Sequence, residues 1–182
     1  TNFAQGVDSM KTEVTRLSSI LLGGVSFYGD PISAKGGWDT ENEIGKTWQR
    51  FMTFLRENPE RPYSCGKQLF YEVHLYGSET KKKGYFEVFV GEEVNTATLP
   101  IALCAKYIPE SDYLKMTLFG REIVGDWWLK LETEILPALG FSAKSSHLIQ
   151  VYDDRFKGMD NVDESILDVF IPIEKNDEQG RI

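Results

Sequence analysis

The sequence has few of the residues that most often carry catalysis or metal binding. Among its 182 residues are two cysteines, Cys65 and Cys104, and two histidines, His74 and His147. Two cysteines are too few for a disulfide framework or a cysteine metal cluster, so a reducing cytoplasm is the expected compartment. The sequence also contains no Gly-x-Ser-x-Gly elbow, no His-Glu-x-x-His pair and no glycine-rich phosphate loop. We therefore expect no metal site, no bound cofactor and no standard set of catalytic residues.

Basic charge and long apolar runs are also scarce. Lysine and arginine number 20 against 28 aspartates and glutamates, which gives a net charge of −8. Direct nucleic-acid binding is not expected, because it depends on basic residues that neutralise phosphates. No apolar run approaches membrane-spanning length, and the start, TNFAQGVDSM, lacks the basic and apolar regions of a secretion signal. The sequence predicts a soluble intracellular protein that does not bind membranes.

Aromatic residues, in contrast, are plentiful. They make up 13% of the chain, as eleven Phe, eight Tyr and four Trp. Aromatic side chains suit both a core and a pocket for a flat ligand. The length is sufficient for one domain, which we place at residues 10–175, with 1–9 as an N-terminal extension or tag remnant and 176–182 as a flexible tail.

The spacing of apolar residues alternates between strand and helix periods. An apolar stripe from Ile44 through Trp48 to Leu55 predicts a helix capped by Asp39 or Thr40, with Trp48 in the core. A second helical stripe covers residues 124–135. Strands are predicted at 13–28, 68–76, 85–94, 102–108, 113–119, 147–152 and 166–173.

Two details of these strands are predicted from local residue types. The pair Gly23-Gly24 inside the first strand indicates a bulge or a close approach of another backbone. The run Lys81-Lys82-Lys83 before Gly84 indicates a solvated hairpin turn.

The elements follow the order strand, helix, strand, strand twice, over residues of about 10–97 and 98–175. Neither unit can bury much apolar surface alone, so pairing of the two is expected. The sequence therefore predicts an α+β fold with an antiparallel sheet, two packed helices and a ligand cleft between the repeats.

The last two strands each have one apolar and one mixed face. In the first, Leu148, Gln150 and Tyr152 share a face; in the second, Asp168 and Phe170 do. Such a mixture of polar and aromatic groups is typical of a small-molecule cavity. It is equally typical of a solvated sheet face, and periodicity alone leaves both readings open.

Four segments of the chain resemble the GyrI-like small-molecule-binding family, which includes the effector-binding domains of AraC-type and MerR-type transcription regulators. In order and spacing these segments cover nearly the whole chain. They are IGKTWQRFMTFL from Ile44, GYFEVFVGEEV from Gly84, the run from Trp127 through ILPALGF, and IQVYDDRF followed by ILDVFIPI.

The resemblance implies a tandem strand-helix-strand-strand fold that binds a hydrophobic, often cationic, aromatic compound in a cleft between the repeats. Family members carry a carboxylate at the position of Gln150. The amide of Gln150 keeps the hydrogen-bonding capacity and lacks the charge. This departure weakens the case for cationic ligands, and also for the glutamate-dependent hydrolysis of strained rings by some relatives.

The predicted ligand-binding residues come from two sources. Matching to the family gives Gln150, Tyr152 and Phe170, and less securely Tyr113 and Phe27 on neighbouring strands. Strand or helix phase adds Trp38, Tyr71, Phe89 and Trp127.

Three functions remain open. The leading hypothesis is a stand-alone, non-enzymatic binder of aromatic compounds, since no helix-turn-helix is visible and the chain is either a stand-alone member or a fragment. The first alternative is a hydrolase of reactive electrophilic small molecules, with Glu72, Glu87 or Glu93 as base; Asp168 is a fourth strand carboxylate. The second is a protein-interaction module of the gyrase-inhibitor type, whose acidic surface contacts a basic partner.

Overall fold

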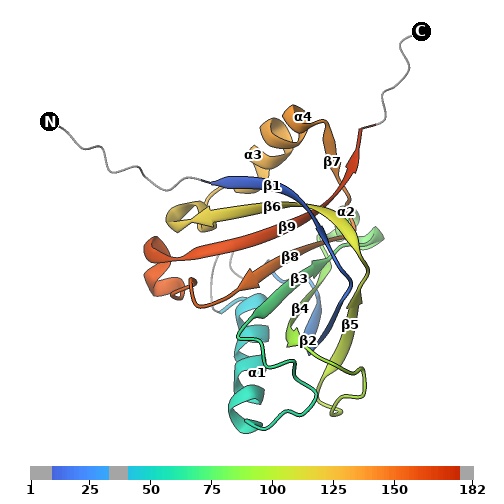
Figure 1. The fold of residues 1–182 in the computed structure, drawn as a ribbon, viewed down its shortest axis with the longest axis vertical. Coiled ribbons are helices and arrows are strands. Elements are labelled where there is room, and N and C mark those ends of the chain that lie inside the picture. The colour runs from blue at the N-terminus through green and yellow to red at the C-terminus, as the bar shows by residue number, and fades with distance from the viewer. Residues whose placement is uncertain (1–9, 33–40, 177–182) are drawn as a thin grey trace, which may run out of the picture.

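An antiparallel sheet carries the other elements of the fold (Figure 1). The computed structural model describes residues 10–32 and 41–176, and within these ranges the sheet has nine strands. The strand order is β1-β6-β9-β8-β3-β4-β2-β5, with β7 beside β9, and every pairing is antiparallel. The predicted α+β class is thus confirmed. The strands are β1 (Lys11–Leu17), β2 (Ile20–Gly29), β3 (Phe70–Leu75), β4 (Phe86–Glu93), β5 (Cys104–Ile108), β6 (Ser111–Phe119), β7 (Phe141–Ala143), β8 (His147–Tyr152) and β9 (Ile166–Lys175).

The first long helix, α1 (Glu43–Glu57), packs on strands β2 and β4. Its cap is Asn42, whose side chain accepts a hydrogen bond from the Gly45 amide at 2.9 Å. The predicted caps, Asp39 and Thr40, lie outside the described residues. Asn58 ends the helix directly before a proline, as the sequence predicts.

The second predicted helix is divided. It consists of α3 (Trp127–Lys130), a π-helical turn η2 (Leu131–Ile135) and α4 (Leu136–Leu139), and it ends at Gly140 in the left-handed conformation. Two short 3-10 helical elements, η1 (Gly120–Val124) and η3 (Met159–Glu164, kinked at Asn161), flank the second half of the sheet.

The two repeats interlock through their first strands. β1 of the first repeat pairs with β6 of the second, and β5 of the second pairs with β2 of the first. The pairing register is the same before and after the gap between β1 and β2. Leu17 faces Ser111, and Ile20, three residues later, faces Ile108. One long two-stranded ribbon, bent at Ser18-Ser19, therefore joins both ends of the sheet.

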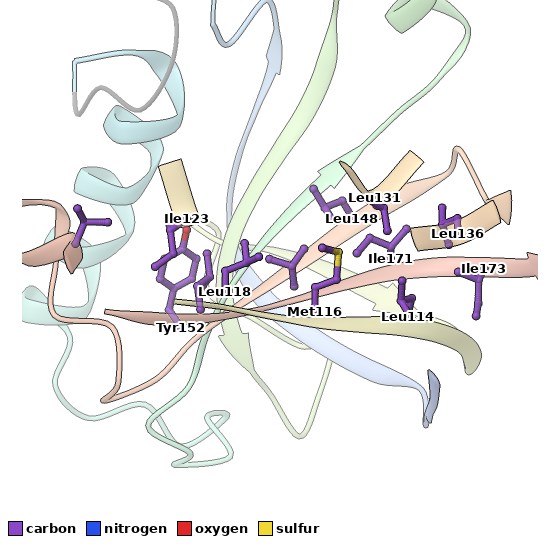
Figure 2. Packing of buried hydrophobic residues seen from close by; sticks show 13 residues of the cluster. Leu114, Met116, Leu118, Ile123, Leu131, Leu136, Leu148, Tyr152, Ile171 and Ile173 are labelled. Carbon is purple, nitrogen blue, oxygen red and sulfur yellow. The ribbon is translucent and has the colours of Figure 1, made fainter. Parts of the chain in front are cut away.

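Apolar side chains of the described residues form clusters on both faces of the sheet. The largest lies between β6, β8, β9 and the segment η1–α4. Figure 2 shows its side chains in a row, with Leu136 and Ile173 at one end and Tyr152 at the other. A second cluster packs α1 on β2 and β4 through Phe51. A third occupies the opposite face, away from these helices, around Phe89 and Tyr113.

Two local predictions need correction. The lysine run is not a hairpin turn: Ser78–Lys83 forms the short helix α2, which ends at Gly84 with φ of 73°. No bulge occurs at Gly23-Gly24, because β2 pairs continuously with β4. The alternative, a close backbone approach, is what the structure shows, since a Cβ built on Gly24 would lie 2.0 Å from the Val90 carbonyl oxygen.

Replacement of Gly24 by alanine should therefore destabilise the fold. The backbone of β4 would have to move, and overpacking of this kind typically costs about 1–3 kcal/mol in the free energy of unfolding. Urea unfolding of Gly24→Ala against Gly77→Ala measures the effect, because a Cβ on Gly77 meets nothing within 4 Å. Equal stability of the two variants would show that β2 and β4 are not packed this closely.

Candidate ligand-binding cavity

A cavity of about 1110 Å³ lies between the two helical segments, over strands β3 and β8. One wall is α1, which contributes Ile44, Trp48 and Met52. The opposite wall carries the adjacent indoles of Trp127 and Trp128 from α3. The loop after β8 closes a third side with residues 153–159. The cavity therefore occupies the predicted position between the repeats.

The pairing of β3 with β8 decides which side chains form the floor. Directly paired residues of antiparallel strands point to the same face of a sheet. Glu72 faces Gln150, and His74 faces Leu148. The floor consists of Phe70, Glu72, His74 and Tyr76 from one repeat and Leu148, Gln150 and Tyr152 from the other.

Glu72 is the most deeply enclosed polar group of this floor, with 3% of its surface exposed. The indole Nε1 of Trp48 donates to its Oε2 at 2.5 Å. The imidazole Nε2 of His74 lies 2.7 Å from its Oε1 and is the donor when the carboxylate is ionised. Donors from α1 and from its own strand thus hold the carboxylate in place.

Tyr152 joins the polar floor to the aromatic walls. Its ring makes edge contacts with the rings of Trp48 and Phe156, with both centroid distances at 4.8 Å. Its hydroxyl donates to Gln150 Oε1 at 2.7 Å and lies 3.5 Å from Glu72 Oε2. Burial, and then the Glu72 charge, raise the pKa of Tyr152 well above its ordinary value, so the phenol remains a donor.

Two other buried carboxylates, Glu92 beside the cavity and Asp168 on the opposite face of the sheet, have guanidinium partners. Arg61 Nε donates to Glu92 at 2.6 Å, and Ser64 donates to the same carboxylate. Arg155 links Asp168, at 2.5 Å, to Asp153, at 2.7 Å. In the described parts of the chain, no lysine or arginine forms an ion pair with Glu72. The cavity floor therefore holds one carboxylate whose charge no neighbouring guanidinium or ammonium neutralises.

The structure separates the predicted site residues into two groups. Gln150, Tyr152 and Trp127 line the cavity. Phe170 does not, because it pairs with Ile149 and so points to the opposite face from Gln150. The remaining predicted residues also lie elsewhere: Tyr113, Tyr71 and Phe89 belong to the cluster on the opposite face, Phe27 pairs with Val88 beyond the cavity, and Trp38 lies outside the described residues.

Several cavity residues were missed or placed differently by the sequence. Trp48, predicted as core, packs there and also lines the cavity. Glu72 was predicted only as a candidate base, and His74, Trp128 and Phe156 were not predicted as ligand-binding residues. The sequence contained a signal for these residues. Alternate positions of β3 form a face of polar and aromatic residues, like the face of Gln150 and Tyr152 on β8.

On the opposite face, the predicted residues form a structural contact. The Tyr113 hydroxyl lies 2.8 Å from His147 Nε2, and its ring meets Phe170 edge-on at 6.3 Å. Burial raises the pKa of Tyr113 to about 12. Burial, and then the charge of Lys144, lower the pKa of His147. This contact joins β6 to β8 across the strand β9 that lies between them.

Metal and membrane sites receive no support from the described residues. In residues 10–32 and 41–176, no three His, Cys, Asp or Glu side chains are grouped to hold a metal ion. None of the helices in these ranges is long and apolar enough to cross a membrane.

A partly open cavity with aromatic walls and a few buried polar groups is typical of a small-molecule-binding domain. The chain belongs to the GyrI-like family: the model for the GyrI-like small molecule binding domain matches residues 10–174. The resemblance read from the sequence is thus confirmed. No curated protein matches the chain in sequence.

Solved structures share the fold at low sequence identity. SAV2435 bound to tetraphenylphosphonium is 12% identical, with a TM-score of 0.65, over 90% of this chain and 94% of that one. The C-terminal domain of EcmrR is 11% identical, with a TM-score of 0.63, over 91% and 98%. A hydrolase encoded by lin2189 from Listeria innocua is 12% identical, with a TM-score of 0.53, over 90% and 92%. At these identities the likeness shows the fold alone.

The lowered pKa of His147 predicts acid sensitivity of the fold. The unfolded chain keeps an ordinary histidine pKa of about 6.5 and binds the proton more readily than the folded chain. The free energy of unfolding should therefore fall as pH drops through about 6.5 toward the lower folded pKa. Urea unfolding over this range measures the slope, which His147→Gln should reduce while His74 remains. An unchanged slope in the variant would show that His147 titrates normally in the folded chain.

Proposed function

We propose that this domain binds a hydrophobic aromatic small molecule in the cavity between its repeats and releases it unchanged. The observation that carries the proposal is the buried carboxylate of Glu72, which pairs with His74 and with no lysine or arginine of the described residues, among aromatic side chains of the cavity. Such a charge is costly to bury, and it is retained where it serves a structural network or a ligand.

The size and chemistry of the walls support this proposal. About 1110 Å³ is ample for a drug-sized compound, since such sites typically measure roughly 300–1,000 Å³. The ring of Tyr152 already makes edge contacts with Trp48 and with Phe156. Each ring that a ligand adds to such contacts contributes about 0.5–1.5 kcal/mol beyond the burial of its area.

Glu72 also changes the expected charge of the ligand. The sequence lacks a carboxylate at Gln150, yet Glu72 stands directly opposite on the paired strand. A cation about 4 Å from this carboxylate gains on the order of 4 kcal/mol at an effective dielectric constant near 20, before its own desolvation. The aromatic walls attract cations as well. A cationic or hydrogen-bond-donating aromatic compound therefore fits the cavity better than an anion.

The known structures are consistent with such a ligand. SAV2435 has been solved with tetraphenylphosphonium, a bulky aromatic cation, and EcmrR supplies a regulator domain of the same fold. Action as a stand-alone protein, a cytoplasmic location, a protein partner and the lack of nucleic-acid binding stay predictions of the sequence.

A matched pair of ions tests the proposed charge preference. Tetraphenylphosphonium and tetraphenylborate have nearly the same shape and opposite charge. We expect the cation to raise the melting temperature of the protein, because a ligand of the folded state stabilises it by mass action, and the anion to have a smaller effect. Glu72→Gln should weaken cation binding at least tenfold, measured by calorimetry.

Glu87→Gln provides the matched control, because Glu87 pairs with Lys106 and does not line the cavity. Equal loss in both glutamine variants would mean that general surface charge attracts the cation. A lack of any stabilisation by aromatic compounds would refute the binding function.

A hydrolase is the second candidate, favoured by the contact between His74 and Glu72 inside the cavity. Of the three carboxylates predicted as bases, Glu72 alone lines the cavity; Glu87 and Glu93 pair with Lys106 and Lys67. A buried carboxylate beside an imidazole can activate water for attack on an electrophile. Listeria innocua hydrolases with this fold add weight to this candidate.

Incubation with strained or activated electrophiles, such as epoxides and aryl esters, separates the two functions. We expect mass spectrometry to recover these compounds at the rate of the buffer control, because both oxygens of Glu72 already accept hydrogen bonds, from Trp48 and His74, as suits a binding group. Turnover that Glu72→Gln abolishes and Glu87→Gln retains would establish the hydrolase instead.

A further inference from the structure

Beside Glu72, the cavity floor contains the side-chain amide of Gln150, whose nitrogen has no hydrogen-bond acceptor among the described residues. The Gln150 side chain is 4% exposed, and its Oε1 accepts from the Tyr152 hydroxyl. Within the described ranges its amide nitrogen donates to no protein acceptor. The nitrogen is open to the cavity, since it is not among the buried, unpaired side-chain atoms of the described residues. A ligand that covers it without offering an acceptor would leave a buried N–H group unpaired, at a cost of about 1–3 kcal/mol. The cavity therefore favours a ligand with an acceptor at Gln150.

The neighbouring Glu72 has the opposite requirement. An ionised carboxylate only accepts hydrogen bonds, and its two oxygens have about four acceptor positions. Trp48 and His74 use two of these, and the Tyr152 hydroxyl is a distant third at 3.5 Å. Since Glu72 lines the cavity, the remaining capacity is directed to a donor on the ligand.

The two groups are close enough to act on one ligand edge. Glu72 and Gln150 are direct partners in the β3–β8 register, for which Cβ atoms lie about 4.5–5.5 Å apart. The single phenol oxygen of Tyr152 contacts both end groups. An acceptor and a donor thus stand side by side on the cavity floor, below the rings of Trp48 and Phe156.

We infer that the ligand carries a planar edge with an N–H beside a carbonyl, as in a lactam, a cyclic imide or a heteroaromatic amide. The N–H donates to Glu72, and the carbonyl accepts from the Gln150 amide nitrogen. This inference rests on the proposed binding function and specifies its ligand class. An onium ion without N–H groups satisfies Glu72 and leaves Gln150 unpaired.

Gln150 is then the residue that selects the ligand. A carboxylate at this position would place two acceptors side by side and would repel the ligand's carbonyl. Discrimination of this kind comes from the unpaired polar group that the wrong ligand leaves behind. The amide therefore shifts preference from simple cations toward neutral donor–acceptor heterocycles.

The test compares 2-quinolone with its N-methyl derivative, which keeps the rings and carbonyl and lacks the donor. Calorimetry with the intact chain should show that 2-quinolone binds roughly tenfold tighter, as expected for one hydrogen bond to a charged group. Because both probes bind the unmodified protein, this comparison does not depend on the folding of any variant.

The variant Gln150→Glu gives a second test, because it should change the affinities for two ligands in opposite directions. It should weaken 2-quinolone roughly tenfold, through the lost donor, and strengthen tetraphenylphosphonium, through the added charge. A misfolded variant would weaken both ligands, so the crossed result is specific to the pair Glu72 and Gln150.

Three results would overturn the inference. The first is equal affinity for 2-quinolone and its N-methyl derivative. The second is a loss on N-methylation combined with no effect of Gln150→Glu on 2-quinolone, which would assign the donor contact to Glu72 alone. The third is binding of tetraphenylphosphonium without binding of 2-quinolone, which overturns the inferred ligand class and leaves the proposed binding function intact. If no aromatic probe binds, the proposed binding function is refuted as well.

Discussion

The antiparallel pairing of β3 with β8 is the constraint on which the cavity depends. It joins the two repeats at the centre of the sheet and places Glu72 opposite Gln150. Because side chains alternate between faces, a slip of one residue would turn the side chains of the strand that moved to the other face, bringing Tyr71 (for β3) or Val151 (for β8) toward the helices instead. The outer neighbours β4 and β9 prevent such a slip, since each buries its own apolar face against a helical segment.

Electrostatics distinguish Glu72 from the other buried carboxylates. Glu92 and Asp168 each have an arginine, Arg61 and Arg155, that offsets the cost of burial. Around Glu72 the compensation comes from the neutral Trp48 indole, from His74 and, at greater distance, from the Tyr152 phenol. Of these partners only His74 can carry a positive charge, and none is an arginine or lysine, so a ligand in this region of low dielectric constant can also interact with the carboxylate.

The interlocked repeats explain why this floor can be rigid. The ribbon formed by β1–β2 and β5–β6 ties both halves of the sheet together, and Arg155 anchors the loop after β8 to β9. The aromatic walls of the cavity come from two different helical segments. Trp48 projects from the regular helix α1, whereas Trp127 and Trp128 precede the π-helical turn η2. A polar floor that is fixed by pairing thus faces rings that come from both repeats.

The sequence by itself determined the antiparallel α+β class and the family, because these follow from local periodicity and from segments of contiguous residues; it did not separate β1 from β2 within residues 13–28, nor predict α2 and β7. It also identified the mixed face of Leu148, Gln150 and Tyr152. Only the tertiary structure decided that Phe170 points away from Gln150, since its face depends on the pairing of Phe170 with Ile149 and not on either strand's own pattern. The same holds for Glu72. Its carboxylate lies 78 positions before Gln150 in the chain, and the register of β3 with β8, a long-range property, makes the two neighbours.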